Sequence, residues 1–597
     1  MRLIVRLASL LILFAAPALA QSLVPSPDEA GYDAPLAAKF DGYDRQIHGL
    51  LAVPLGFGLE AFVSAPGNRA LIDGFIASGS RDFKAQTGKH PYEVLDNYEE
   101  FGDLGMFGGV QAAGDAFRYG ALREGHAPAA EVEVARAALL RAMDGLHWAT
   151  QITGEPGAVV RGLRRVRPEA GEPPLPGVAP ALTPLFDDAG RPLPAPKQDA
   201  WRADRSGQLP FLIWVDGCSK DQLDGYVFGL GAAYDVAAND PSVPPEKLSR
   251  LVEDARAIGL RLMRKVEVEP GKSADLVIVD PDGRPTPFHD LSAEEFAPGA
   301  VSALPVNGFN ALLALGITRT LFHITGDEQI GNFYYDELVH TRNYFAAIEQ
   351  SAGLMYAGTT TNYSNVNMAF VAAYGVLRYE SDPKLARRMR ALLESVLYAP
   401  GKDREARGLG QSFFDFIDAA FRTDGIADAG ATALFQGLET LREARSAPTW
   451  DVPVTNCDAA EIDAGVCVGV DGTPITLEAN DGRGGGPVAV KPIPMRIRPT
   501  SNFEWRSDPH SPNGDGSPRL NPGGELAAAY WMGRFLKAGS DGTGNISASA
   551  RPRPGTGTAP ADTAPSATGC HCQGAASALI PGALLALARA VSRRRRG

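Results

Sequence analysis

The stretch that decides the fold reads DLGMFGGVQAAGDAFRYGAL and covers residues 103–122. Its glycine, alanine and aromatic residues fall on every side of a helix, and a helix that is small or apolar all round is predicted to be buried. Residues 131–152 follow with apolar positions at helical spacing, which is typical of an amphipathic helix that covers another. The two segments together predict a hairpin of one inner and one outer helix.

This hairpin pattern recurs along the chain, with a first helix rich in Gly, Ala and aromatic residues and a more charged second one. Four more pairs and a last single helix are predicted at residues 222–238 with 245–266, 307–325 with 329–350, 366–379 with 383–397, 411–421 with 427–445, and 523–538. No exact sequence repeat accompanies them. The predicted fold class is mainly α, an (α/α)6-type toroid in which outer helices surround inner ones.

Small insertions interrupt the helical pattern. Residues 166–200 are crowded with proline and predict an irregular excursion. Residues 274–288, inside an insertion at 267–300, read as two short strands around a Pro-Asp-Gly turn. A third insertion, at residues 446–500, is also poor in helical pattern. The predicted organisation of the body is a linker at residues 21–45 and a toroid domain at residues 46–538.

Residues 1–20, MRLIVRLASLLILFAAPALA, have the pattern of a signal peptide. Arg2 and Arg6 give a positive start, and the apolar stretch that follows is too short to span a bilayer comfortably. Small residues then precede Gln21, which predicts export and cleavage after Ala20. The alternative interpretation is a buried N-terminal helix.

The C-terminal end has three parts in order. Residues 539–568 are rich in Gly, Ser, Thr, Pro and Ala and predict a flexible linker. Residues 569–597 contain a Gly-Cys pair at Cys570, a short apolar run and a final cluster of arginines. This order resembles the myxobacterial type of C-terminal sorting tail.

That resemblance implies processing near Cys570 and lipid or covalent attachment of Cys570, as in a lipoprotein-like anchor, to the outer surface of the cell envelope. It also implies contact with the export and sorting machinery and with the membrane. The alternatives are a plain C-terminal transmembrane anchor, which the final arginines would orient, or a metal-binding Cys-His-Cys.

Composition limits the partners. The net charge is −13, and no basic stripe occurs outside the last residues, which argues against nucleic acid. The nine histidines are scattered without ligand spacing, so neither a catalytic metal nor another cofactor is predicted. Cys457 and Cys467 lie ten positions apart in a loop-like stretch and predict a local disulfide in an oxidising compartment. Cys218 is then expected to be a buried, inert thiol.

The body resembles the six-hairpin glycosidase-like enzymes, which include glycoside hydrolases and polysaccharide lyases. The resemblance covers residues 95–538 and rests on the paired helices, on TGEPG at residues 153–157 followed by Arg161, and on YWMGR at residues 530–534. It implies an active site in the funnel at one end of the inner ring, lined by loops and helix starts. It transfers no catalytic residue, because no single family within this group matches.

The segment at residues 216–226 is the first candidate lining of that funnel. It places Asp216, Lys220, Asp221 and Asp224 directly before or within the start of an inner helix. Paired carboxylates are what acid/base cleavage of a glycosidic bond requires, so Asp221 and Asp224 are candidate catalytic residues and Asp216 and Lys220 candidate substrate ligands. The structural alternative is a capping box with Asp221 complementing the helix dipole.

Two further segments open inner helices. Residues 99–103 end in Asp103, the third candidate catalytic carboxylate, although a capping role suits this segment as well. Residues 359–367 are dense in amides and hydroxyls, with Asn362, Tyr363 and Asn365 as candidate sugar ligands or ordinary caps.

Two isolated side chains complete the candidate site. Arg161 is a candidate anion clamp and Trp505 a candidate stacking platform. A buried structural role is the alternative for both.

Three functions remain open. The first is a surface-displayed carbohydrate-active enzyme that hydrolyses a polysaccharide with paired carboxylates. The second is a polysaccharide lyase, in which Tyr363 and Arg161 would supply the base and the cation. The third is a non-catalytic protein that binds glycans or a partner. A hydrolase requires two carboxylates from different helices to converge in the funnel. A lyase requires a cluster of Tyr, His and Arg there instead, and a binding protein requires aromatic residues without a carboxylate pair.

Overall fold

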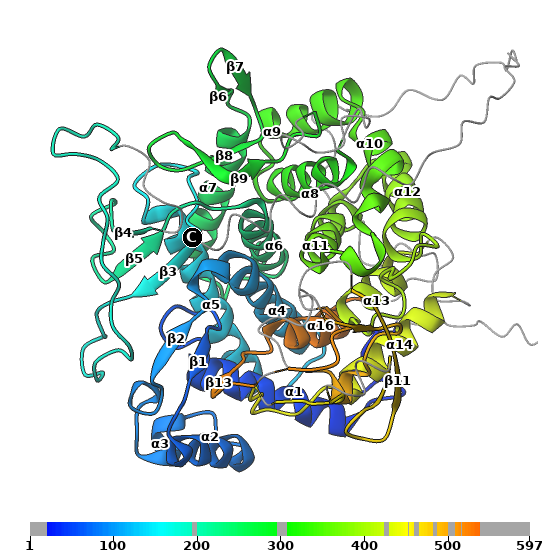
Figure 1. Cartoon of the computed structure of the whole chain (residues 1–597). Coiled ribbons are helices and arrows are strands. Elements are labelled where there is room, and N and C mark those ends of the chain that lie inside the picture. Colours follow the sequence, from blue (N-terminus) through cyan, green and yellow to red (C-terminus); the bar gives the residue numbers. More distant parts are fainter. Residues whose placement is uncertain are drawn as a thin grey trace, which may run out of the picture.

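A ring of inner helices forms the centre of the molecule (Figure 1). The computed structural model describes residues 21–193, 200–294, 307–422, 429–451, 453–458, 465–480, 486–499, 508–514 and 516–537. Within them, neighbouring helices of the ring are in contact in the order α4 (Leu104–Glu124), α6 (Lys220–Ala237), α8 (Gly308–Thr325), α11 (Tyr363–Tyr379), α13 (Ser412–Phe421) and α16 (Gly524–Phe535), and α16 returns to α4. The predicted toroid is confirmed.

The inner helices are buried on all sides, as their composition requires. In α4 every residue from Leu104 to Leu122 is buried. Small residues let α4 and α6 approach closely: a Cβ atom on Gly109 would lie 2.0 Å from the carbonyl oxygen of Gly225. Because no side chain fits there, glycine at both positions sets the distance between the two helices.

Outer helices cover the ring, one beside each inner helix. They are α5 (Ala129–Gln151), α7 (Pro245–Leu262), α10 (Tyr344–Ser351), α12 (Pro383–Leu392) and α14 (Ala429–Glu443). Two predicted outer helices are less regular than expected. Residues 329–350 divide into α9 (Glu328–Asn332), a π-helical stretch (Phe333–Thr341) and α10, and α12 changes to a π-helical stretch at Leu393–Tyr398.

The sixth outer helix is α1 (Ala34–Gln46), so the linker predicted over residues 21–45 is wrong. Asp33 caps this helix by accepting a hydrogen bond from the backbone N–H of Leu36. Leu36, Phe40 and Tyr43 are buried, and the ring of Phe40 stacks on that of Tyr530 in α16 at 4.4 Å. The first and last helices of the body therefore form the hairpin that closes the toroid.

The strands form small separate sheets. The predicted pair near residues 274–288 is confirmed as β8 (Val277–Val279) and β9 (Pro285–Asp290), and a second hairpin, β6 (Val266–Glu269) with β7 (Lys272–Ala274), precedes it. The other sheets are β3 (Gly162–Arg165), β5 (Leu212–Val215) and β4 (Trp201–Ala203) in that order; β10 (Val466–Val468), β11 (Pro474–Glu478) and β12 (Val488–Ala489); and β13 (Arg519–Leu520), β1 (Glu60–Phe62) and β2 (Asn97–Glu99). Two short helices, α2 (Pro66–Ser78) and α3 (Phe83–Thr87), lie between β1 and β2 along the chain.

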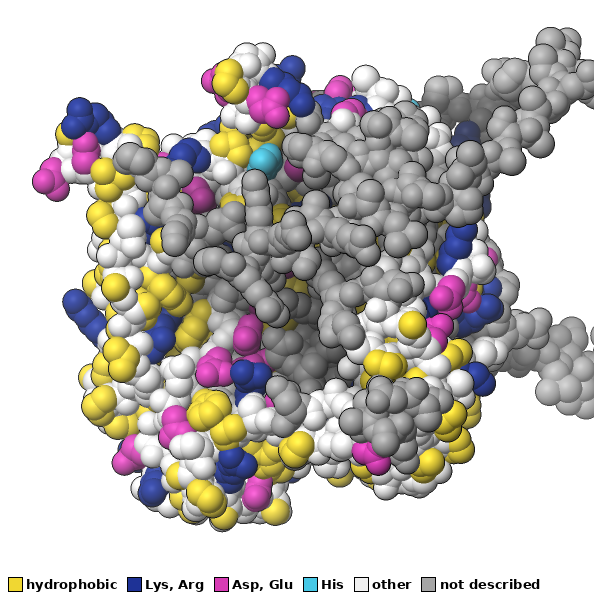
Figure 2. Space-filling view, in the orientation of Figure 1, with side chains coloured by type: hydrophobic (Ala, Val, Ile, Leu, Met, Phe, Trp, Pro, Cys, Tyr) yellow, Lys and Arg dark blue, Asp and Glu magenta, His cyan; other side chains and the backbone are white. Residues whose placement is uncertain are grey.

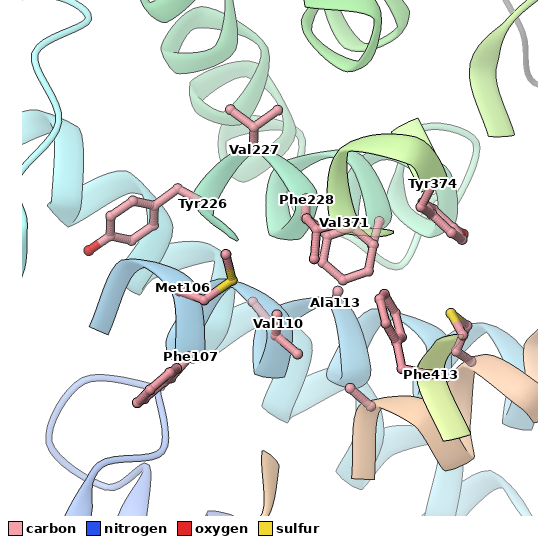
Figure 3. Close-up of a cluster of buried hydrophobic side chains, with 14 of the residues drawn as sticks. Met106, Phe107, Val110, Ala113, Tyr226, Val227, Phe228, Val371, Tyr374 and Phe413 are labelled. Carbon is pink, nitrogen blue, oxygen red and sulfur yellow. The ribbon is translucent and has the colours of Figure 1, made fainter. Parts of the chain in front are cut away.

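Aromatic side chains fill the interior of the ring (Figure 3). Phe228 of α6 lies 5.2 Å from Tyr374 of α11 and 5.8 Å from Phe413 of α13, measured between ring centroids. Phe117 of α4 contacts Phe228 at 6.1 Å and Phe535 of α16 at 5.5 Å. Aromatic pairs in edge-to-face or stacked geometry thus join five of the inner helices (α4, α6, α11, α13 and α16), which stabilises the core beyond simple burial.

The cysteines of the body behave as predicted. Cys457 and Cys467 form a disulfide within the β10–β12 region, and both are buried. Cys218 is a buried free thiol, and burial raises its pKa, which keeps it protonated and unreactive.

The predicted signals at the two chain ends, including Ala20 and Cys570, lie outside the described residues. Within the described part of the chain, no helix combines the length and the apolar character needed to cross a membrane.

Candidate functional site

The starts of α4 and α6 lie side by side and bring two predicted catalytic carboxylates together. Asp103 directly precedes α4, and Asp221 lies in the first turn of α6. The side-chain nitrogen Nε2 of Gln222 lies 3.4 Å from Oδ1 of Asp103 and donates to Oδ2 of Asp221 at 3.1 Å. Both carboxyl groups therefore lie within reach of one nitrogen atom.

Gln222 holds this arrangement in place from both ends of its amide. Its Oε1 accepts a hydrogen bond from the backbone N–H of Met106 at 3.0 Å, which ties α6 to the first turn of α4. The capping box that Ser219 and Gln222 could have formed is absent among the described contacts: Ser219 precedes α6 but makes no side-chain cap, and its hydroxyl donates to Asp221 instead. The polar residues at the start of α6 therefore bind one another, and Gln222 also binds α4.

Arg161, which directly precedes strand β3, joins the same cluster. Its Nη2 lies 3.6 Å from Oδ1 of Asp103, and its Nη1 donates to the hydroxyl of Ser219 at 3.2 Å. The side chains remain open to solvent, with exposed fractions of 19% for Arg161 and 13% for Asp103. A guanidinium group and two carboxyl groups thus share one partly exposed polar site.

This site belongs to the end of the ring at which the inner helices begin. The space-filling view shows this face hollowed near its centre, with acidic and basic side chains at the edge of the hollow (Figure 2). The interior of the ring holds the packed aromatic side chains of Phe228, Tyr374 and Phe413. Charged side chains thus lie at the edge of this hollow, which is called the funnel below.

Asp224 lies one turn deeper and does not share the exposed site. It is 2% exposed and, with Thr320 of α8 and Tyr374 of α11, lines a small space between the three helices. Burial, and then the charge of Asp221, raise the pKa of Asp224 well above its ordinary value. Asp224 is therefore a protonated carboxylic acid of the core beneath Asp221.

The side chain of Lys220, at the start of α6, lies on the side of α8. Its ammonium group donates to Oδ1 of Asn310 in α8 at 3.0 Å, and Nδ2 of Asn310 donates to Asp290 at 3.2 Å. Burial lowers the pKa of Lys220. These contacts tie α6 to α8 and place Lys220 beside the carboxylate pair rather than within it.

Asp216 has a structural partner. Its carboxylate is 8% exposed, accepts from Nε of Arg202 at 3.0 Å and from the backbone N–H of Ala200 at 2.8 Å, and so joins β4 to the end of β5. The substrate role predicted for Asp216 finds no support in this geometry, because both carboxylate oxygens are already bound.

The third predicted segment lies at the start of α11. Asn362 caps the helix by accepting from the backbone N–H of Ser364 at 3.2 Å, and its Nδ2 lies 3.4 Å from Oδ1 of Asn365. Both asparagines are half-buried, which leaves them able to meet a ligand. The capping interpretation is thus correct for Asn362, and its amide nitrogen remains beside Asn365.

Tyr363 is buried and belongs to a second cluster. It is 4% exposed and its ring lies 6.5 Å from that of His510, nearly parallel to it. Burial lowers the pKa of His510 to about 4, and the charge of Arg404 contributes. Tyr363, His510 and Arg404 thus lie together, whereas Arg161 lies with Asp103 and Asp221. Trp505 lies outside the described residues.

Two buried carboxyl groups near the site could not be found from the sequence. Glu60 of β1 pairs across the sheet with Glu99 of β2, and Nε of Arg519 lies 3.1 Å from each of them. Burial raises the pKa of Glu60 to about 9. Asp280 accepts from the backbone N–H of Gly217 at 3.0 Å, and burial raises its pKa to about 7. Neither residue stands in a segment that opens an inner helix, and such segments were the pattern that indicated candidate site residues.

No group of three or more His, Cys, Asp or Glu side chains among the described residues is arranged to hold a metal ion.

Comparison with known proteins identifies no family. No protein-family model matches the chain, and no curated protein matches it. Among solved structures, a sugar epimerase from a ruminal bacterium is similar at 10% sequence identity over 71% of this chain and 87% of that protein, with a TM-score of 0.28. A likeness of this size carries no functional argument, so function is inferred from the site itself.

Proposed function

We propose that this protein is an exported carbohydrate-active enzyme, a glycoside hydrolase that acts on a polysaccharide with Asp103 and Asp221 as its catalytic pair. The observation that carries the proposal is the meeting of these two carboxyl groups at Gln222, from the starts of two different inner helices. Both are close to one nitrogen atom, and glycosidases keep their two carboxyl groups about 5–9.5 Å apart. One group would protonate the leaving oxygen while the other would act as base or nucleophile.

The surroundings of the pair suit this chemistry. Arg161 and Gln222 restrict the positions of both carboxyl groups, and fixed positions are what acid/base catalysis needs. The half-buried amides of Asn362 and Asn365 stand at the start of another inner helix and can bind sugar hydroxyls. The hollow on this face in Figure 2 would receive the polysaccharide.

The test is to measure the release of reducing ends from a panel of polysaccharides by wild type, Asp103→Asn and Asp221→Asn. Each substitution keeps the shape and removes the acid or base, so turnover should fall by a factor of about 10² or more. Asp28→Asn, at an exposed position away from the pair, is the matched control and should retain full turnover. Full turnover in both site variants would refute the assignment.

A polysaccharide lyase is the second candidate, because Tyr363, His510 and Arg404 lie together at the start of α11. A lyase would produce an unsaturated uronate, which absorbs ultraviolet light, and Tyr363→Phe would abolish that signal. Tyr363 and His510 are 4% and 1% exposed, so a substrate could reach them only after the cover over them moves. The carboxylate pair is partly exposed and therefore has the stronger support.

A protein that only binds glycans is distinguished by the same assays. It would retain oligosaccharides but release neither reducing ends nor unsaturated products, and Asp103→Asn would change affinity without any turnover to lose.

A further inference from the structure

One half-buried arginine near the carboxylate pair has no polar partner. Arg164 lies in β3, and its guanidinium group makes no hydrogen bond or ion pair with the residues that the structure describes. Its contact is with an aromatic ring: Cζ lies 5.1 Å from the ring centroid of Phe101. Burial lowers the pKa of Arg164, and no charged group among the described residues contributes to that shift.

The neighbouring arginines differ from Arg164 in this respect. Arg161 lies 3.6 Å from Asp103, and Arg165 lies 3.0 Å from Glu169. A half-buried charge without a partner costs free energy that such pairs recover. An anionic ligand would recover it for Arg164.

A ligand can reach the guanidinium group of Arg164. Arg118 and Arg319 each have nitrogen atoms that are fully buried without a partner, whereas Arg164 has none. Because its nitrogens also make no hydrogen bond within the described part of the chain, each of them retains surface that solvent can contact. Its N–H donors are therefore available to a molecule from outside.

Phe101 connects Arg164 to the carboxylate pair. Phe101 begins and Asp103 ends the single 3-10 turn that leads into α4. Strand β3 lies directly against this turn, because a Cβ on Gly162 would lie 1.8 Å from the carbonyl oxygen of Phe101. A 3-10 helix rises about 2 Å per residue, so Phe101 and Asp103 are about 4 Å apart along its axis. Arg164 thus lies beside the turn that carries one of the two proposed catalytic groups.

Aromatic side chains accompany the guanidinium group. Trp201 of β4 contacts Phe101 edge-to-face, with 5.6 Å between the ring centroids, and both rings are half-buried. The cation–π contact with Phe101 restricts the guanidinium plane and leaves its hydrogen-bond donors unused. That planar fork fits the paired oxygens of a carboxylate, and aromatic rings suit the C–H faces of a sugar.

The overall charge of the protein makes a local site necessary for an acidic polymer. The net charge is −13, which repels polyanions and opposes their nonspecific binding. Binding of an acidic polysaccharide would therefore have to come from a particular cation that lacks a partner of its own.

We propose that Arg164, together with Phe101 and Trp201, binds an acidic sugar of the polysaccharide, next to the sugar that Asp103 and Asp221 would cleave. The inference rests on the proposed function for the polymer and adds the charge of its sugars. A uronate carboxylate and a sulfate ester share the anionic oxygens that a guanidinium group binds.

Isothermal titration calorimetry of the mature protein tests this with hexamers of galacturonate, of sulfated galactose and of galactose. At least one acidic hexamer should bind wild type more tightly than the neutral one, and the stronger of the two identifies the anion. Arg164→Gln should weaken that binding about tenfold or more, because a charged hydrogen bond is lost. The fold should persist, since no hydrogen bond within the described residues is removed.

Two further variants serve as controls. Arg164→Lys keeps the charge without the planar fork and should retain part of the affinity. Arg387→Gln removes an exposed arginine from the outer helix α12 and should bind as wild type does.

The outcomes separate this site from the proposed hydrolase. Binding of an acidic hexamer that persists in Asp103→Asn and falls in Arg164→Gln supports the site, even if no polysaccharide is cleaved. Binding that Arg164→Gln leaves unchanged overturns the site, and cleavage that depends on Asp103 and Asp221 would then stand alone. Equal affinity for the neutral hexamer, or no binding of either acidic one, overturns it as well.

Discussion

Glu60 is a buried carboxyl group surrounded by others. It is 2% exposed, and besides Glu99 the charges of Glu100 and Asp451 oppose its ionisation, whereas only that of Arg519 favours it. With a pKa of about 9, Glu60 is protonated at neutral pH in the folded protein and ionised in the unfolded chain. The fold therefore takes up a proton at this residue.

This proton uptake predicts a dependence of stability on pH. The pKa of Glu60 is higher in the folded protein than in the unfolded chain. Its contribution to the free energy of unfolding is therefore fully present below the unfolded-state pKa of about 4.5 and is lost as pH rises through about 9. One titrating group changes the free energy of unfolding by at most about 1.4 kcal/mol per pH unit. Glu60→Gln should remove this slope and raise stability at pH 8 relative to wild type.

Urea denaturation of both proteins from pH 5 to pH 9 measures the difference, since other buried carboxyl groups contribute equally to each. Glu131→Gln, exposed on α5, is the control and should follow wild type. Parallel stability curves for wild type and Glu60→Gln would show that Glu60 is ionised in the folded state.

At the residue scale, the sequence located the side chains whose place depends on their position along a helix. Asp103 and Asp221 stand at helix starts that the pattern located, and the ring brings those starts together. Asp216 stands in the same segment, but its partner Arg202 comes from strand β4, which follows the proline-rich insertion, and no periodicity reveals the path of that insertion. Glu60 was missed because its burial follows from strand pairing between distant segments.

At the scale of elements, the contact between α4 and α6 depends on glycine. A Cβ on Gly109 would lie 2.0 Å from the carbonyl oxygen of Gly225, and backbone at that distance cannot yield as a side chain can. Gly109→Ala should therefore lower the free energy of unfolding by about 1–3 kcal/mol or more, as overpacking does. Because the carboxylate pair spans these two helices, turnover should fall with it.

Gly74 of α2 is the matched control. Nothing lies within 4 Å of a Cβ built there, and the position is an exposed helix interior. Gly74→Ala should raise stability by about 0.5–1 kcal/mol because alanine favours the helix. Thermal melts of the two variants should shift in opposite directions; a melting temperature for Gly109→Ala equal to that of wild type would show that α4 and α6 can separate freely.

Helices could be predicted where their burial gives the sequence a recognisable composition. The inner helices are small or apolar on all sides, and each was located within a few residues. The break between the π-helical stretch and α10 was missed because Asn343 takes a left-handed conformation, with φ of 50°, inside an otherwise helical pattern. The α1 helix was missed although Asp33 and Pro35 are ordinary start signals, because no inner-type helix precedes it in the chain.

At the scale of the whole molecule, the proposed export and anchoring depend on residues at the chain ends. Cys570→Ser should leave the body folded, because Cys570 lies beyond α16, and should shift the protein from the cell envelope to the medium or trap an uncleaved precursor. Immunoblots of envelope and medium fractions check this. Normal processing and unchanged envelope retention would contradict the assignment of the sorting tail.

The pairing of α1 with α16 has a consequence for the order of folding. Val24 donates from its backbone N–H to the carbonyl of Gly533 at 2.8 Å, and Ser22 bridges to Lys537, so the two ends of the body lie side by side. A chain is synthesised from its N-terminus, so α1 is made before the other helices of the body. Its partner α16 is made last. Contacts between such distant segments form slowly. The seam between α1 and α16 is therefore expected to close late, and a chain that ends before Gly524 lacks the helix that covers one flank of α4.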